Sequence, residues 1–189
     1  IPKTYLPSYR EFYEDRWFTP AGYALSDTID LAGQKAPFGT DILFRLRGFA
    51  SAVIGIEICE DLWVPLSPHE YQAACGATVL LNLSASNDIL GKADWRKTMV
   101  ASESGRCIAA YGYVSSGRGE SSNDIIYGGQ GIIAENGVLI QETKSPLSGP
   151  QLIFSDIDVD RLAHDRRAAT GFRELSNRSA AFRIVETEV

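Results

Sequence analysis

Two nearly continuous apolar runs, separated by a short helical segment, constrain the fold of this chain more than any other feature. The runs cover residues 49–58 and 78–83. Runs of this length, rich in β-branched residues, are typical of strands buried on both faces of a sheet. Residues 69–75 between them predict a helix that ends at Gly76. This order predicts a pair of parallel strands joined by a crossover helix.

Further elements extend this unit into a single mixed sheet. We expect a strand over residues 42–46, a helix over 94–106 and a third buried strand over 107–114. Asn136-Gly137 predicts a type I′ hairpin between strands at 131–134 and 139–140. Shorter strands are expected at 23–24, 125–127, 152–158 and 182–185, and a charged helix at 159–169. The length of 189 residues favours one α/β domain with a mixed sheet over residues 1–189.

Composition excludes several classes of function. Lys and Arg number 18 against 24 Asp and Glu, and the net charge of −6 argues against binding to a nucleic-acid backbone. No apolar run approaches the roughly 20 residues that cross a bilayer, so we expect no membrane partner. Three separated cysteines and two histidines, without a Cys-x-x-Cys pair, predict neither a disulfide framework nor a metal site. These features favour a cytoplasmic protein.

The chain opens on Ile1-Pro2-Lys3, without an initiator methionine. We therefore expect this sequence to be an internal part of a longer protein, with a strand that runs into Ile1.

Cys59 is the first candidate for chemistry, because it follows a buried strand at its carboxyl end. Ligands of α/β sheets bind in the crevice beyond such strand ends, and a sharp turn there exposes a nucleophile. The alternative is a small buried hydrophobe, the role that we expect for Cys75 and Cys107. A thiolate also needs a partner, and either a papain-like histidine (His69 or His164) or the Lys3 ammonium can supply it.

Several motifs in order along the chain strongly resemble one family. They are Lys3-Thr-Tyr-Leu-Pro with Glu14, Pro37-Phe-Gly-Thr40, Gly55-Ile-Glu-Ile-Cys-Glu-Asp-Leu-Trp63, Gly76 to Ser86, Gly119-Glu-Ser-Ser122, and Tyr127 to Gly137. Together they resemble the amidase domain of glutamine-dependent NAD+ synthetases, in the nitrilase or carbon–nitrogen hydrolase superfamily. The resemblance implies a four-layer αββα sandwich and a Glu–Lys–Cys catalytic triad.

The resemblance assigns roles to particular positions. Cys59 corresponds to the nucleophile, and Lys3 with the backbone N–H of Glu60 corresponds to the pair that holds the oxyanion. Glu14 corresponds to a supporting carboxylate that orients Lys3. The general-base glutamate lies upstream of the lysine in the family, so we expect it to precede Ile1 and this fragment to be inactive alone.

The same resemblance implies a glutamine pocket formed by Tyr9, Glu60, Trp63, Ser86 and Lys92. Glu60 suits the ammonium of the substrate, Lys92 its carboxylate, and Ser86 either one. The alternative for Ser86 and Lys92 is a polar loop at the strand end. Residues 115–123 are either an active-site loop or a flexible connector.

The implied activity is hydrolysis of glutamine to supply ammonia for NAD+ synthesis on a separate synthetase domain. This chain then needs no cofactor or metal, whereas the synthetase domain uses ATP and Mg. Residues 160–189 would lead toward that domain, and their arginines (Arg161, Arg166, Arg167) form either a contact or a solvated face. A homo-oligomer is also implied. The alternatives are a standalone amidase for another small amide and a non-catalytic scaffold.

Overall fold

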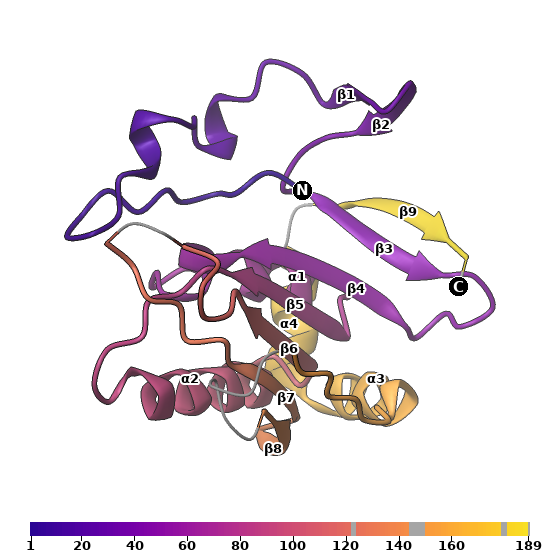
Figure 1. The fold of residues 1–189 in the computed structure, drawn as a ribbon. Helices are drawn as coiled ribbons and strands as arrows, with labels where there is room; N and C mark the ends of the chain where they lie inside the picture. The colour runs from indigo at the N-terminus through magenta and orange to yellow at the C-terminus, as the bar shows by residue number, and fades with distance from the viewer. Residues whose placement is uncertain (122–123, 144–149, 179–180, 189) are drawn as a thin grey trace.

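The computed structural model describes residues 1–121, 124–143, 150–178 and 181–188, and its main element is a seven-stranded mixed sheet (Figure 1). The strand order is β8-β7-β6-β5-β4-β3-β9. The strands are β3 (Ile42–Leu46), β4 (Val53–Ile58), β5 (Val79–Ser84), β6 (Ala110–Ser115), β7 (Gly131–Glu135), β8 (Val138–Glu142) and β9 (Arg183–Thr187). A separate hairpin pairs β1 (Thr28–Leu31) with β2 (Gln34–Pro37).

The predicted strand–helix–strand unit is confirmed at the centre of the sheet. Strands β4, β5 and β6 are parallel neighbours. The crossovers contain α1 (Pro68–Ala74) and α2 (Lys92–Arg106). The Asn136-Gly137 hairpin is also confirmed, since both residues have positive φ and join antiparallel β7 and β8. Within the described ranges, no helix has the length and apolar character needed to span a membrane.

The two faces of the sheet differ in their cover. Helices α1 and α2 pack on one face, where Val53, Gly55 and Glu57 of β4 alternate as buried residues. Side chains of the opposite face are apolar but only partly covered, and Leu83 and Val114 are 50% and 57% exposed. The α/β fold class is thus confirmed, and the residues described supply one large sheet with helices on one of its faces (Figure 1).

Three predicted strands were wrong and one hairpin was missed, because the partner or signal that decides each structure was not visible in the local sequence. Residues 23–24 adjoin a 3-10 turn, η2 (Ala21–Tyr23), and form no strand. Residues 125–127 contribute a single bridge, Asn87 to Tyr127. Residues 152–158 alternate apolar and polar side chains but pair with none of the described strands, and Leu152 is 87% exposed. The β1–β2 hairpin was missed because Ala32-Gly33 forms its left-handed turn without an asparagine.

The C-terminal segment is integrated into the same domain. Helix α3 (Val159–Ala168) buries Leu162 and Arg166, and β9 pairs in parallel with β3 at the sheet edge. Helix α4 (Thr170–Arg178), which sequence reasoning missed, packs on α3. The charged helix at 159–169 and the strand at 182–185 are confirmed with small shifts, while the expected course of residues 160–189 toward a further domain stays a prediction.

Candidate active site

Cys59 lies on a sharp turn at the carboxyl end of β4. The strand ends at Ile58, and Cys59 opens the 3-10 turn η3 (Cys59–Leu62) with a φ of +52°, in the left-handed region. A non-glycine residue there carries strain of about 1–3 kcal/mol, which the surrounding structure must hold. Cys59 is 7% exposed. This geometry is that of a nucleophile elbow, which presents a side chain beside the first backbone N–H groups of a helical turn.

Asp61 fixes this turn and also anchors the N-terminal segment. Its buried carboxylate accepts hydrogen bonds from the backbone N–H groups of Ile58 (3.0 Å), Tyr5 (2.9 Å) and Thr4 (3.2 Å). Burial raises the pKa of Asp61 to about 6, although the three N–H donors oppose the shift. Sequence reasoning missed this role, for which the signal is an aspartate two residues after the candidate nucleophile.

The anchored segment brings Lys3 and Glu14 together. Lys3 Nζ lies 2.5 Å from Glu14 Oε2, and both side chains are largely buried. Burial raises the pKa of Glu60, while its hydrogen bond from Tyr9 and the charges of Lys3 and Lys92 oppose the increase. Lys3 therefore lies within electrostatic range of the residue that follows the candidate nucleophile.

Cys59 and all five predicted substrate-binding residues line one cavity of about 370 Å³. The five are Tyr9, Glu60, Trp63, Ser86 and Lys92. Arg10, Asn87, Gly91 and the apolar residues Phe12, Ile89, Leu90 and Trp95 complete the wall. Lys3 and Glu14 do not line it; Glu14 instead lines a neighbouring cavity of about 170 Å³ together with Ser121 of the 115–123 loop.

The cavity wall carries groups of opposite charge. The Tyr9 hydroxyl donates to the Glu60 carboxylate at 2.9 Å, and burial together with this hydrogen bond raises the pKa of Tyr9 to about 12. Lys92, the first residue of α2, donates to Asn87 Oδ1 and lies 4.8 Å from the centre of the Trp63 ring. Burial lowers the pKa of Lys92. Such a wall complements a ligand that carries both an ammonium and a carboxylate.

A buried polar network lies on the helix-covered side of the sheet, behind the turn. Asn82 Nδ2 donates to Glu57 Oε1 at 3.0 Å and lies 3.5 Å from the carbonyl oxygen of Cys59. Glu57 also accepts from the Tyr111 hydroxyl and contacts His69 Nδ1 at 3.0 Å. All four of these polar side chains are 0–1% exposed. The sequence signals were a glutamate and an asparagine within otherwise apolar strands, and sequence reasoning did not use them.

His69 is a member of this network and not a partner of Cys59. Its second ring nitrogen lies 3.3 Å from Glu103 Oε2. Burial opposes protonation of the imidazole, but hydrogen bonds to Glu103 and Glu57 outweigh it and raise the pKa of His69 to about 9. His164 is exposed on α3. The structure therefore gives no support to a papain-like pair.

One group in the described chain has donor atoms close enough for a metal ion. Ligand atoms of His69, Glu103 and Cys107 lie within 4.8 Å of one another. The sequence did not predict this cluster, because its members are 34 and 4 residues apart. Both nitrogens of His69 already contact carboxylates, and burial raises the pKa of Cys107 to about 12, away from the thiolate that binds metals.

Solved structures with the same fold include hydrolases and synthetases. A carbon–nitrogen hydrolase from Helicobacter pylori aligns with a TM-score of 0.62 at 18% identity, over 91% of this chain and 56% of that one. A glutamine-dependent NAD(+) synthetase from Cytophaga hutchinsonii aligns with a TM-score of 0.61 at 36% identity, over 74% of this chain and 22% of that one. The chain is a nitrilase-like domain with the carbon–nitrogen hydrolase fold.

Sequence comparison shows to which family within this fold the chain belongs. The glutamine-dependent NAD(+) synthetase of Mycobacterium tuberculosis is 43% identical over 166 residues, 88% of this chain and 24% of its own length. That of Mycobacterium leprae is 41% identical over 189 residues (98% and 28%), and the human one 32% over 193 residues (95% and 25%). No protein-family model matches. The chain belongs to the family of glutamine-dependent NAD(+) synthetases. It spans about a quarter of the length of these relatives.

Proposed function

We propose that this domain hydrolyses the side-chain amide of glutamine, with Cys59 as the nucleophile. One observation carries the proposal: Cys59, on its strained turn, lines the same cavity as Glu60 and Lys92. A nucleophile and two opposite charges in one small cavity fit an amino-acid substrate with an electrophilic side chain.

The reaction proceeds by two acyl transfers. The Cys59 thiolate attacks the amide carbon. The family resemblance assigns the developing oxyanion to Lys3 Nζ and the backbone N–H of Glu60. Collapse of this intermediate expels the nitrogen, which takes up the thiol proton and leaves as ammonia. Water then cleaves the γ-glutamyl thioester, so that glutamate leaves and the thiol is restored. Glu14, 2.5 Å from Lys3, orients the ammonium.

A carboxylate must carry the proton between sulfur, nitrogen and water. We assign this general base to a glutamate of the longer protein and not to Glu14, whose partner is Lys3. This assignment rests on the family resemblance.

Recognition of the substrate uses the charged wall of the cavity. Glu60 binds the α-ammonium, with Tyr9 holding its carboxylate in place. Lys92 and Ser86 bind the α-carboxylate, and Trp63 packs against the aliphatic part of the substrate. A volume of about 370 Å³ lies at the lower end of the range for small-molecule sites and accommodates one amino acid.

The ammonia produced here would serve NAD+ synthesis in the complete protein. The mycobacterial and human relatives are named as glutamine-dependent synthetases, and this chain matches a quarter of their length. We infer that ATP and Mg are used by a further synthetase domain, that the complete protein acts in the cytoplasm, and that it assembles as a homo-oligomer. Within this chain, the reaction requires no cofactor.

Covalent labelling of the complete protein that carries this chain tests the site. A glutamine-like diazoketone should modify Cys59, with Cys75 and Cys107 as internal controls read by peptide mass spectrometry. Protection by glutamine is expected, and protection by another small amide instead would indicate a different amidase. Equal labelling of Cys59 and Cys107 would contradict the proposal and favour a scaffold, because Cys107 is 4% exposed and its pKa is raised.

A further inference from the structure

Arg96 is fully buried, and its guanidinium supports the cavity wall from behind. It extends from α2, is 0% exposed, and donates through Nη2 to Ser86 Oγ at 3.1 Å and to the Asn87 carbonyl at 3.2 Å. Nη1 donates to Gln130 Oε1 at 2.6 Å, and the guanidinium lies 5.6 Å from the centre of the Tyr113 ring. Ser86 and Asn87 both line the cavity that holds Cys59.

The charge of Arg96 has no counter-charge in the part of the chain that the structure describes. None of the ion pairs there includes Arg96, and its Nε makes no hydrogen bond to the described residues. An unpaired buried charge is destabilising, and an anion nearby offsets that cost. The other buried arginine of the described chain, Arg166, donates to three backbone carbonyls and so stabilises the packing of α3.

Lys92 lies one helical turn before Arg96 on the same face of α2. The two cations are close enough for Arg96 to help lower the pKa of Lys92, after burial itself. Glu60, which also lines the cavity, accepts a hydrogen bond from Tyr9, and its charge acts on Lys92. The side-chain amide of Asn87 donates a hydrogen bond to the Glu11 carboxylate, so Glu11 also lies near this side of the cavity. Lys92 and Arg96 therefore place two positive charges on the α2 side of the cavity. The Glu11 and Glu60 carboxylates act on Lys92, and neither forms an ion pair with Arg96.

We propose that Arg96 is the residue that makes this cavity select substrates with a free α-carboxylate. It acts as a positioning residue: it holds Ser86 and Asn87 in place and adds a fixed positive charge behind them, without touching the substrate. The inference rests on the proposed function, since it names a determinant of specificity in the same site. This fixed charge favours a ligand with an anion at the wall over a neutral ligand of the same size and shape.

Two probes separate this role from simple structural support. One is the glutamine-like diazoketone with a free carboxylate, and the other has a carboxamide at that position. The second-order rate of Cys59 labelling is measured with each in the complete protein that carries this chain. In the Arg96→Gln variant, we expect the carboxylate probe to react roughly 10- to 100-fold more slowly, and the carboxamide probe to change by less than about twofold. Arg96→Lys keeps a charge without the planar fork and should retain part of the preference.

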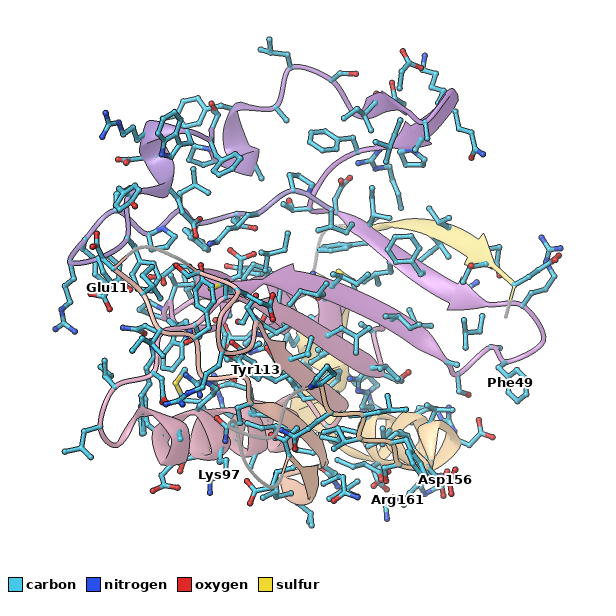
Figure 2. All side chains as sticks on the ribbon, in the orientation of Figure 1. Glu11, Phe49, Lys97, Tyr113, Asp156 and Arg161 are labelled. Carbon is cyan, nitrogen blue, oxygen red and sulfur yellow. The ribbon has the colours of Figure 1, made fainter. Side chains whose placement is uncertain are left out.

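Lys97→Gln is the matched control, because Lys97 is the next residue of α2 (Figure 2), does not line the cavity, and pairs with Asp94 at 2.9 Å and Glu142 at 3.5 Å. It should keep the full preference. Equal loss with both probes in Arg96→Gln, or no loss with either, would overturn the inference. If Arg96→Gln does not fold, Ser86→Ala tests the same wall and should lose the preference about threefold or more.

The outcomes also separate the inference from the function on which it rests. If neither probe labels Cys59 in the wild type, the proposed function itself fails. If both label it at equal rates, the site is reactive but does not select a carboxylate, and only the role of Arg96 is refuted.

Discussion

The buried imidazole of His69 predicts a measurable dependence of stability on pH. Its two ring nitrogens lie 3.0 and 3.3 Å from carboxylates of Glu57 and Glu103, and its side chain is 1% exposed. Burial alone would lower the pKa, but the carboxylates raise it from 6.5 to about 9. The folded protein therefore binds this proton more tightly than the unfolded chain, and the stabilisation is lost as the pH increases.

The size of the effect follows from the shift. A difference of about 2.5 pKa units corresponds to roughly 3 kcal/mol, because each unit is worth about 1.4 kcal/mol. This contribution is fully present below pH 6.5 and is lost as the pH rises through about 9. Between pH 6 and pH 9, the free energy of unfolding should therefore fall by roughly 3 kcal/mol more in the wild type than in His69→Gln.

Urea unfolding at a series of pH values measures this difference. The matched control is His164→Gln, which removes the exposed histidine of α3 and should leave the wild-type profile unchanged. Other titrating groups, such as Asp61, contribute equally to all three proteins and cancel in the comparison. Parallel profiles for wild type and His69→Gln would refute a protonated imidazole held between the two carboxylates.

Three further substitutions test the site. Asp61→Ala leaves three backbone N–H groups without their acceptor, so it should lower the free energy of unfolding by roughly 1–3 kcal/mol and expose the Lys3 segment to proteolysis. Asn82→Ala removes the side chain that bridges Glu57 and the Cys59 carbonyl. It should slow Cys59 alkylation more than it changes the affinity for glutamine, which is measured by protection from alkylation. Lys92→Met should weaken glutamine protection about tenfold or more, while alkylation of Cys59 by a small neutral iodoacetamide stays within about twofold.

The part of the fold that could be predicted is the part encoded by patterns of adjacent residues. The central strands and their helices were predicted because apolar runs and helix signals are read from adjacent residues, and their parallel pairing follows from connection length. Residues 152–158 show the limit of this reasoning. Their alternation is typical of a strand, but a strand requires a hydrogen-bonded partner, and the pattern does not reveal that no strand in the described part of the chain pairs with them.

The site was predictable to a similar extent. The elbow at Cys59 follows from a buried strand ending at a cysteine, and the cavity residues follow from the family resemblance. Buried partners such as Asp61 and Arg96 were not predicted, because most of their contacts are with residues 9 to 57 positions away. Charged residues that are fully buried become visible only when the fold is known.

The central claim, that Cys59 releases ammonia from glutamine for NAD+ synthesis, is tested most directly in the complete protein that carries this chain. NAD+ formation is measured with glutamine and, separately, with free ammonium as the nitrogen source. The account predicts that Cys59→Ala abolishes synthesis from glutamine and retains synthesis from ammonium. Unchanged synthesis from glutamine in the Cys59→Ala variant would contradict it.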